Sequence, residues 1–559
     1  MDLPGKERCV QIFYVLLLFF ALLAGRLALI QLLRGDYYAQ KALARETVTV
    51  SLEEYPRGEI LDRRLRPLTK GMFVSRVAVF PQAMDDPGAV AGELTGLLGV
   101  PAEELVREVR SARVLPYAIS PRQAAAVRER NLPGVLVVPF YRRYGPDPLA
   151  AQAVGYLGRP QQDERNDSGE GGDWVGRTGL ELYYDRELAG CRPKGYARLY
   201  TDAAGQWLKG RGIEIAFAVS GQDRKNVVTT IDLDIQQIVE EVLDARVKNG
   251  AAVVLDVQNG DILALASRPR YDPDPGKIAG YLAKPEALVD QAISLFAPGS
   301  LFKVVVAAAA LAEGVVTPET EFTCRGKDDW PVRCWAAEGH GKLTFEQAFA
   351  QSCNPVFARL ALTLGAEKLI ACARLFGLDN QEIAGYPVPF DRRQDLALVA
   401  APDNLVNSSL GQGPVLATPV QIAAMINAIA NDGTYYPPRL VREIRTADGK
   451  VVRSFSAGPP RQAVSTEVAR QLQKMLTLAT TEGIGKKAYL AGWGSAGKTG
   501  SAQTAGGVNA WFCGYTPVRQ PKYVVAVFVK NGASGSETAA PLFKEIAERI
   551  WGVDPAGRL

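Results

Sequence analysis

In the stretch APGSLFKVVVAAAALA, residues 297–312, Pro298-Gly299 ends an irregular segment, and the residues from Leu301 onward favour a helix. Ser300 falls in the first turn of this predicted helix, near the positive end of the helix dipole. Lys303 follows three residues later, so its amine is expected on the same face, one turn away. A serine hydroxyl becomes a good nucleophile when an adjacent base takes its proton. The spacing therefore predicts a serine nucleophile and a lysine base, provided that burial or nearby cations lower the lysine pKa.

The SxxK pattern is weak when taken alone. A second copy, Ser495 to Lys498, lies among glycines, where a helix is not expected and the same-face argument fails. A helix-start serine followed by a solvated lysine explains residues 300–303 equally well. The neighbouring sequence has to decide between the two interpretations.

Outward from this stretch, the chain alternates strand and helix signals. A strand at 227–231 and a helix at 234–248 precede two apolar runs, 251–256 and 261–267, which flank Asn259-Gly260 and predict a hairpin. A long helical region follows, from about Ser300 to Asn431. Two strands and a closing helix are predicted near the end, at 510–515, 523–530 and 541–551. This order is typical of an α+β fold, in which one antiparallel sheet is flanked by helices.

The part before residue 226 is mixed and irregular. Helices are predicted at 101–113 and 121–130, and an apolar run at 135–141 lies between polar segments. The Gly-rich segment 165–172 is predicted to be an exposed loop.

Two more short motifs carry chemistry. In Ser352-Cys353-Asn354, the hydroxyl can shuttle a proton and the amide can hold both a lysine and a substrate amide. In Lys498-Thr499-Gly500, continued by Ser501, a cation and a hydroxyl beside a glycine suit a strand edge along which a peptide lies. Lys498 is a candidate to bind a substrate carboxylate and to lower the pKa of Lys303. Each motif alone is more often a cap or a turn, but the ordered set is far more specific.

Composition excludes several classes. The 559 residues carry 64 basic and 60 acidic side chains without a basic block, so we expect no nucleic-acid partner. The single histidine, His340, rules out multi-histidine metal sites, and without an orienting acid it is not expected to be the base. The seven cysteines form no CxxC pair, so we expect no zinc site, and no metal or cofactor.

The N-terminus is apolar from Ile12 to Gly25 and, after Arg26, on to Leu33. This length, about 20 residues, can span a membrane, although the uninterrupted part alone resembles a signal-peptide core. We expect a short cytoplasmic segment at 1–10, an uncleaved single-pass anchor at 11–33 and the remainder outside the cytoplasm.

The ordered set SxxK, SxN and KTG resembles the penicillin-binding proteins. RGEILDR at 57–63, GLE at 179–181 and LGQG at 410–413 are similar to elements of their class B, monofunctional members. The resemblance implies a penicillin-binding, serine β-lactamase-like transpeptidase domain at 226–559 on an elongated, dimerisation-type pedestal at 36–221. The family usually continues the first element with Asn-Gly, whereas Arg64-Leu65 stand here, which puts that turn in question.

The resemblance also implies a mechanism. Ser300 would take the acyl group of a D-Ala-D-Ala stem peptide while Lys303 accepts its proton, and Ser352 and Asn354 would relay protons and position the donor. An amine of a second stem peptide would resolve the acyl-enzyme, whereas β-lactams would stall it. A separate glycosyltransferase is the expected partner. The resemblance assigns substrate binding to Lys498, Thr499, Gly500 and Ser501. It also implies that the backbone N–H groups of Ser300 and Ser501 donate to the oxyanion.

Other functions stay open at this point. A D,D-carboxypeptidase or a β-lactamase would use water to resolve the acyl-enzyme, and a β-lactam-binding scaffold or sensor would not turn over at all. The sequence also leaves open whether the chain serves elongation and cell shape, division or sporulation.

The cysteines near the SxN motif allow two hypotheses. A disulfide between Cys334 and Cys353 would distort or block the site and make activity redox-gated. Alternatively, Cys353 is a buried thiol and Cys324 forms a structural bridge with Cys334.

Overall fold

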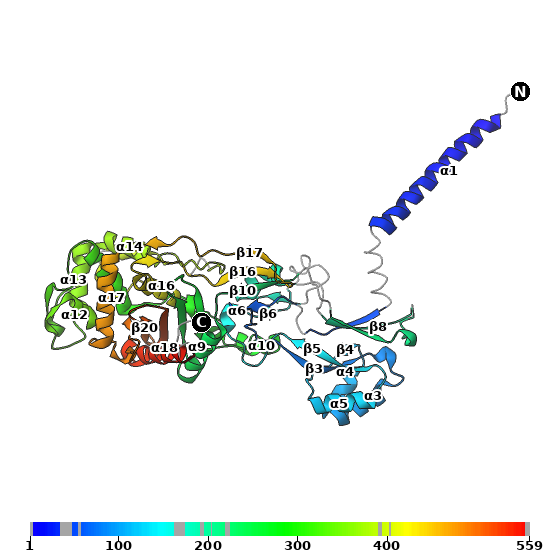
Figure 1. Cartoon of the computed structure of the whole chain (residues 1–559), viewed down its shortest axis with the longest axis horizontal. Helices are drawn as coiled ribbons and strands as arrows, with labels where there is room; N and C mark the ends of the chain where they lie inside the picture. Colours follow the sequence, from blue (N-terminus) through cyan, green and yellow to red (C-terminus); the bar gives the residue numbers. More distant parts are fainter. Residues whose placement is uncertain are drawn as a thin grey trace. The chain divides into compact units, whose positions relative to one another are not determined.

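The structure is a computed structural model, drawn in Figure 1. It describes residues 4–33, 47–53, 57–160, 174–189, 195–202, 204–217, 224–388, 394–401 and 404–553, without the side chains of 4–10. The loop predicted at 165–172 lies outside these ranges. The chain forms two compact units. The smaller comprises Met1–Tyr55, Met72–Arg142 and Pro193–Val219, and the larger comprises Pro56–Gly71, Arg143–Arg192 and Ser220–Leu559.

The smaller unit begins with α1 (Pro4–Ala28), which continues as a π-helical turn over Leu29–Leu33. Its segment Gln11–Gln31 has a mean hydropathy of 2.4, so by length and composition it can cross a membrane.

Two antiparallel sheets complete the smaller unit. The first has the order β1 (Thr47–Ser51), β8 (Gly195–Tyr200), β9 (Ile213–Phe217). The second has the order β4 (Arg113–Val114), β3 (Met72–Val79), β5 (Val135–Arg142). The apolar sides of three helices share a core with the second sheet: α3 (Pro87–Leu98), α4 (Ala102–Val109) and α5 (Pro121–Arg130). The helix predicted at 101–113 is shorter than expected, because it ends at Val109, residues 110–112 turn, and Arg113 begins strand β4.

The larger unit is built on a five-stranded antiparallel sheet. Its order is β12 (Ile262–Arg268), β11 (Gly250–Asp256), β21 (Tyr523–Gly532), β20 (Gly507–Thr516), β19 (Ala496–Thr504). β11 pairs with β21 along its whole length, from Gly250 opposite Val529 to Asp256 opposite Tyr523. The prediction that strands from both ends of this domain meet in one sheet is confirmed.

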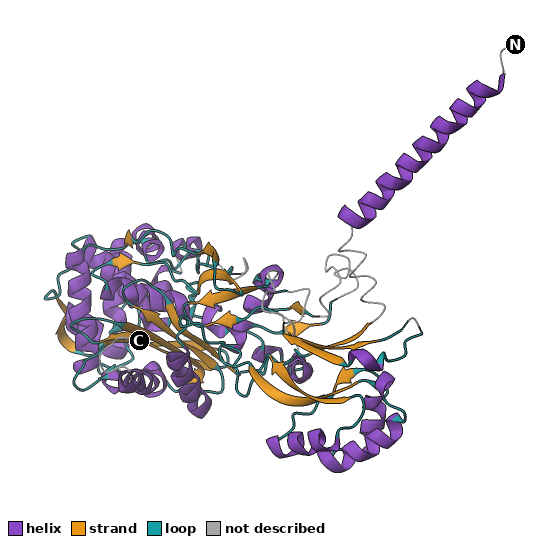
Figure 2. Ribbon diagram, turned by 45° about the vertical axis from the view of Figure 1, so that its right-hand side comes forward, coloured by secondary structure: helices purple, strands orange, loops and turns teal. Residues whose placement is uncertain are grey.

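Side-chain alternation gives this sheet two apolar faces. Val253 and Trp511 belong to one core, while Val254 and Phe512 belong to the other. The first face is covered by α16 (Pro419–Ala430), and the second by α9 (Leu233–Arg246) and α18 (Ala540–Val553). Figure 2 shows helices on both sides of the strands.

The region expected to be continuously helical is interrupted. Residues Gly299–Phe302 form a 3-10 turn, and α11 begins only at Lys303 and runs to Ala312. A short hairpin, β13 (Glu321–Cys324) with β14 (Gly341–Thr344), then precedes further helices. These are α12 (Phe345–Ala350), α13 (Asn354–Leu364), α14 (Ala366–Leu375) and, later in the chain, α17 (Thr466–Thr481).

The turn put in question by the missing Asn-Gly is formed all the same. Asp62 accepts hydrogen bonds at one carboxylate oxygen from the backbone N–H groups of Arg64 and Arg66, both at 2.8 Å. Leu65 adopts the left-handed conformation, with φ +66°. Its side chain lies near the surface, so the turn needs no glycine to fit, only the conformational cost of a left-handed leucine.

The GLE motif supplies a buried carboxylate. Glu181 accepts hydrogen bonds from Arg57 Nε at 3.0 Å and from Arg143 Nη2 at 2.7 Å, and Tyr144 adds a third donor. Burial alone would raise the pKa of Glu181, but Arg143 and Arg57 hold that pKa below its ordinary value. The motifs at 57–63 and 179–181 therefore meet in one buried ion network within the larger unit.

We expect Glu181→Gln to destabilise the larger unit by about 3–5 kcal/mol, because two buried guanidinium groups lose their shared carboxylate. Thermal unfolding of the full chain measures this, with Glu286→Gln, an exposed carboxylate of the same unit, as the matched control. Equal unfolding midpoints for the two variants would show that the network contributes nothing.

Candidate active site

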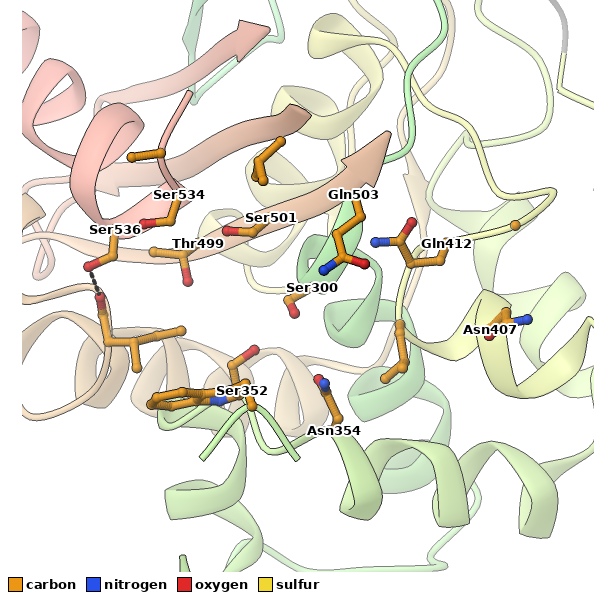
Figure 3. Close-up of a pocket in the computed structure, with 16 residues that line it drawn as sticks. Ser300, Ser352, Asn354, Asn407, Gln412, Thr499, Ser501, Gln503, Ser534 and Ser536 are labelled. Carbon is orange, nitrogen blue, oxygen red and sulfur yellow. Dashed lines mark hydrogen bonds between the residues drawn. The ribbon is translucent and has the colours of Figure 1, made fainter. Parts of the chain in front are cut away.

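The three motifs converge on one cleft of about 930 Å³ in the larger unit (Figure 3). Ser300 points into it from the 3-10 turn, between strand β19 on one side and the loop before α13 on the other. Five of the sequence-predicted site residues line the cleft: Ser300, Ser352, Asn354, Thr499 and Ser501. The two predicted lysines, Lys303 and Lys498, are buried beside it.

Ser300 is positioned by a close backbone contact with β19. Gly299, with φ +57°, donates its N–H to the Gly411 carbonyl at 3.0 Å. A Cβ on Gly299 would lie 2.7 Å from the carbonyl carbon of Ser501, and a Cβ on Gly411 would lie 2.0 Å from the Gly299 oxygen. Only glycine allows this approach. The LGQG segment therefore helps to hold the 3-10 turn against the strand.

Lys303 is fully buried at the start of α11, and its amine has defined partners. Its Nζ donates to the Ser352 carbonyl and to Asn354 Oδ1, both at 2.7 Å, and lies 3.2 Å from Ser352 Oγ. The first two oxygens can only accept, so they take two amine hydrogens. In the neutral amine, the remaining position is a lone pair that can accept a proton from a hydroxyl, and Ser352 Oγ, at 3.2 Å, lies within hydrogen-bond distance of it.

Burial lowers the pKa of Lys303 to about 7, although the thiols of Cys353 and Cys334 act in the opposite direction. The pKa of Lys498 lies well below its usual value, first because of burial and second because of repulsion from Lys303. We expected Lys498 to lower the pKa of Lys303, but burial of the Lys303 amine is what lowers it. A substantial fraction of Lys303 is therefore neutral near pH 7.

The SxN loop presents its groups through an unusual backbone. Ser352 has φ +55°, a left-handed conformation that costs a serine roughly 1–2 kcal/mol. This conformation turns both its carbonyl and its hydroxyl toward Lys303, while Asn354 begins α13. Strain of this kind persists only where the surroundings hold it in place.

The KTG motif lies on the edge strand of the large sheet, as expected, and not in a glycine turn. Gly500 passes so close to the loop before Ser300 that a Cβ would meet the Pro298 oxygen at 2.4 Å. Thr499 Oγ1 is buried and has no hydrogen-bond partner among the described residues, although Thr499 lines the cleft. An unpaired buried hydroxyl is costly, so this atom is suited to a ligand. In the other SxxK copy, Ser495 Oγ donates to the Ala488 carbonyl at 2.8 Å.

Several cleft residues were not singled out from the sequence. Asn407 lies before the LGQG segment, and Ser534 and Ser536 follow strand β21. Ser534 accepts a hydrogen bond from the Glu537 N–H, at the start of the turn leading into α18. A serine with glutamate three residues later is a helix-start signal, and it could have placed this segment.

The cysteines near the cleft form a cluster. Ligand atoms of Cys324, Cys334, His340 and Cys353 all lie within 4.8 Å of one another. The five cysteines with described side chains all carry free thiols. A hydrogen bond with Cys353, together with backbone N–H donors, lowers the pKa of Cys334 to about 5. The sequence indicated Cys324, Cys334 and Cys353 as possible disulfide partners, but it did not predict that His340 joins them, because the four members come from separate positions of a hairpin, its loop and a helix start.

Comparison with family models gives two matches. Residues 250–548 match the penicillin binding protein transpeptidase domain, and residues 53–223 match the penicillin-binding protein dimerisation domain.

Individual relatives agree with these models. Stage V sporulation protein D of Bacillus subtilis is 30% identical over 94% of this chain and 82% of its own length. Peptidoglycan D,D-transpeptidase MrdA of Haemophilus influenzae is 25% identical over 97% and 91%. The chain is also similar to a solved structure of a peptidoglycan synthase complex that coordinates polymerization and crosslinking. The sequence identity is 26% and the TM-score is 0.73, over 98% of this chain and 99% of that one.

Proposed function

This chain belongs to the class B penicillin-binding proteins, and we propose that it cross-links peptidoglycan by passing the acyl group of a stem peptide through Ser300. Its enzymatic class is peptidoglycan D,D-transpeptidase. The observation that carries the proposal is the buried amine of Lys303, whose two short donor contacts leave its third position for a proton from a hydroxyl.

In the first step, Ser300 Oγ attacks the carbonyl carbon of the penultimate D-Ala, and Lys303 takes the hydroxyl proton. The C–N bond to the terminal D-Ala then breaks, and its amine leaves with a proton relayed through Lys303 and Ser352. An ester between the stem peptide and Ser300 remains. The acid–base part of such a step contributes typically 10²–10⁴-fold in rate.

The same geometry supports stabilisation of the transition state. The backbone of Gly299, directly before Ser300, lies against the backbone of Ser501, which supports the N–H groups of Ser300 and Ser501 as the donors to a developing oxyanion. Thr499 Oγ1 and Lys498 are suited to the terminal carboxylate of the donor, which would restore the charge on Lys498. Asn354 would hold the donor amide as well as Lys303.

In the second step, an amine of another stem peptide attacks the ester carbonyl. The amine proton passes to Lys303 and then to Ser300 Oγ, which completes the cross-link and frees the enzyme. A β-lactam acylates Ser300 in the same way: the ring C–N bond breaks and the ring nitrogen takes the proton. That nitrogen stays tethered to the acyl group and does not leave the cleft, so the acyl-enzyme persists.

We further propose that α1 anchors the chain as a single-pass membrane protein with the larger unit outside the cytoplasm. Its apolar span supports the anchor, and the basic Lys6 and Arg8 before it support the direction. The likeness to a structure of a peptidoglycan synthase complex supports a separate glycosyltransferase as the partner that supplies glycan strands.

The test of the function uses purified full-length chain and uncross-linked glycan strands that carry pentapeptide stems. The proposal expects D,D-cross-linked muropeptides with one released D-Ala per link, and none with Ser300→Ala. Release of D-Ala without cross-links would favour the carboxypeptidase alternative. Penicillin acylation without any turnover of the strands would favour the β-lactam-binding scaffold.

Lys498→Ala is expected to lower acylation by a carboxylate-bearing donor about 10²-fold, because a charge-assisted hydrogen bond worth about 1.5–3 kcal/mol is lost. The loss should fall mainly on KM and should shrink for an amidated donor that lacks the carboxylate. Stopped-flow acylation with the matched pair of donors measures both effects. An equal loss for both donors would contradict carboxylate binding at Lys498.

A further inference from the structure

Beside the cleft, the hairpin β13–β14 folds back on itself and gathers side chains that the transpeptidase mechanism does not use. Cys324 ends β13, where it pairs with Gly341, and His340 comes immediately before β14. Cys334 lies in the loop between them, and its N–H donates to the Gly326 carbonyl at 2.9 Å. Cys353 reaches the same point from the start of α13.

Two glycines make this folding possible. Gly326 and Gly339 have φ +72° and φ +80°. A Cβ on Gly326 would meet the Ala337 oxygen at 2.0 Å, and a Cβ on Gly339 would meet the Cys324 oxygen at 2.4 Å. The loop is thus closed by backbone contacts that only glycine permits, and this closure brings its three ligand-type residues together.

The donor set is that of a closed zinc site. Three thiol sulfurs and one imidazole make the Cys₃His combination of structural zinc sites, and no oxygen ligand is part of the cluster. Zn–S bonds of about 2.3 Å place tetrahedral sulfurs about 3.8 Å apart, so the observed spread, at most 4.8 Å, needs only a small contraction. His340 Nε2 is buried and has no hydrogen-bond partner among the described residues, while Nδ1 lies 3.5 Å from Cys334 Sγ.

We propose that Cys324, Cys334, His340 and Cys353 bind one Zn²⁺ ion, and that this ion prevents a disulfide between Cys334 and Cys353. Metal and disulfide exclude each other, because the disulfide consumes two of the four ligands. In the metal-free chain, a peroxide can oxidise the pair. The two thiols give up two electrons and two protons, an S–S bond forms, and hydrogen peroxide is reduced to two molecules of water.

The site matters to the cleft because Cys353 lies between Ser352 and Asn354. Zinc would tie this strained loop to the hairpin and so hold the two groups that contact Lys303. Trp335 supports the same connection, since it lines the cleft, donates its indole N–H to the Gln351 carbonyl at 3.1 Å and packs edge-on against His340. The ion is thus a structural support for the SxN loop and takes no part in the chemistry.

Metal content tests the first half of the proposal without using transpeptidase activity. Untagged full-length chain, purified under reducing conditions without chelator, should carry about one zinc by mass spectrometric metal analysis. Cobalt substitution should give thiolate-to-cobalt charge-transfer bands and intense tetrahedral d–d bands.

Cys324→Ser should lose most of the metal. Cys372→Ser and Cys513→Ser, which replace buried thiols of the same unit outside the cluster, should keep it. His340→Ala, the least buried ligand, should fold and bind zinc at least tenfold more weakly in chelator competition.

Absence of zinc together with absence of cobalt bands in the wild-type chain would overturn the site, as would equal zinc in Cys324→Ser and Cys372→Ser.

The second half of the proposal, protection of the thiols by zinc, is tested with hydrogen peroxide on zinc-loaded and chelator-stripped protein, followed by non-reducing peptide mapping. The Cys334–Cys353 linkage should form at least tenfold faster in the stripped chain. Equal rates would overturn protection by zinc. Neither the zinc content nor the rate of disulfide formation depends on transpeptidase activity, so both tests remain valid if the cross-linking assay fails.

Discussion

Lys303→Ala is expected to slow acylation by a β-lactam about 10³–10⁴-fold, because the hydroxyl of Ser300 loses the base that accepts its proton. Lys303→Arg should not restore the rate, since a guanidinium stays protonated at all working pH values. Stopped-flow labelling with a fluorescent penicillin measures the rate constants, and Lys474→Ala, an exposed lysine on α17, is the control. A rate for Lys303→Ala within tenfold of wild type would remove this lysine from the mechanism.

The pH profile of the wild-type rate follows from the same group. The neutral amine is the active form, so the rate should rise with pH and level off above about 7, where burial places the pKa of Lys303. Below that pH it should fall about tenfold per unit. Burial is the main cause of this low pKa, and the thiols of Cys353 and Cys334 act in the opposite direction. A rate that is flat between pH 5 and 9 would contradict a lysine base.

Ser300→Ala should abolish both β-lactam attachment and cross-linking while the fold is retained, because the side chain lies at the cleft and its loss leaves no buried group unpaired. We expect attachment to fall more than 10⁴-fold, to background. Gel fluorescence after penicillin labelling measures it, and circular dichroism with thermal unfolding confirms the fold.

Ser495→Ala is the matched control, since this serine begins the other SxxK sequence. It should label like wild type and lose about 1 kcal/mol of stability with its hydrogen bond to Ala488. Persistent labelling of Ser300→Ala, or loss of labelling in Ser495→Ala, would reverse the assignment of the two copies.

The large sheet could be predicted because its strands carry their own signals. The Asn259-Gly260 hairpin and the apolar runs at 251–256 and 523–530 require no knowledge of distant contacts. Alternation then fixes both faces, and the helices that flank the sheet follow from their apolar sides. Ser300, Ser352 and Thr499 could be grouped only through the ordered motif set, which stands in for contacts that the sequence does not reveal.

Local rules failed where long-range contacts override them. The helix predicted from Leu301 begins at Lys303, because the close contact of Gly299 with β19 tightens the preceding turn. The left-handed conformation of Ser352 carries no signal in its own residue type. The meeting of His340 with Cys324, Cys334 and Cys353 was also not predicted, since these residues come together through the closure of a glycine-containing loop.

The most direct measurement is the location of the penicillin adduct in the wild-type chain by tryptic mass mapping. The account predicts one adduct, on the peptide 278–303 that contains Ser300. An adduct on the peptide 343–359, which contains Ser352, or on 488–498, which contains Ser495, would contradict it.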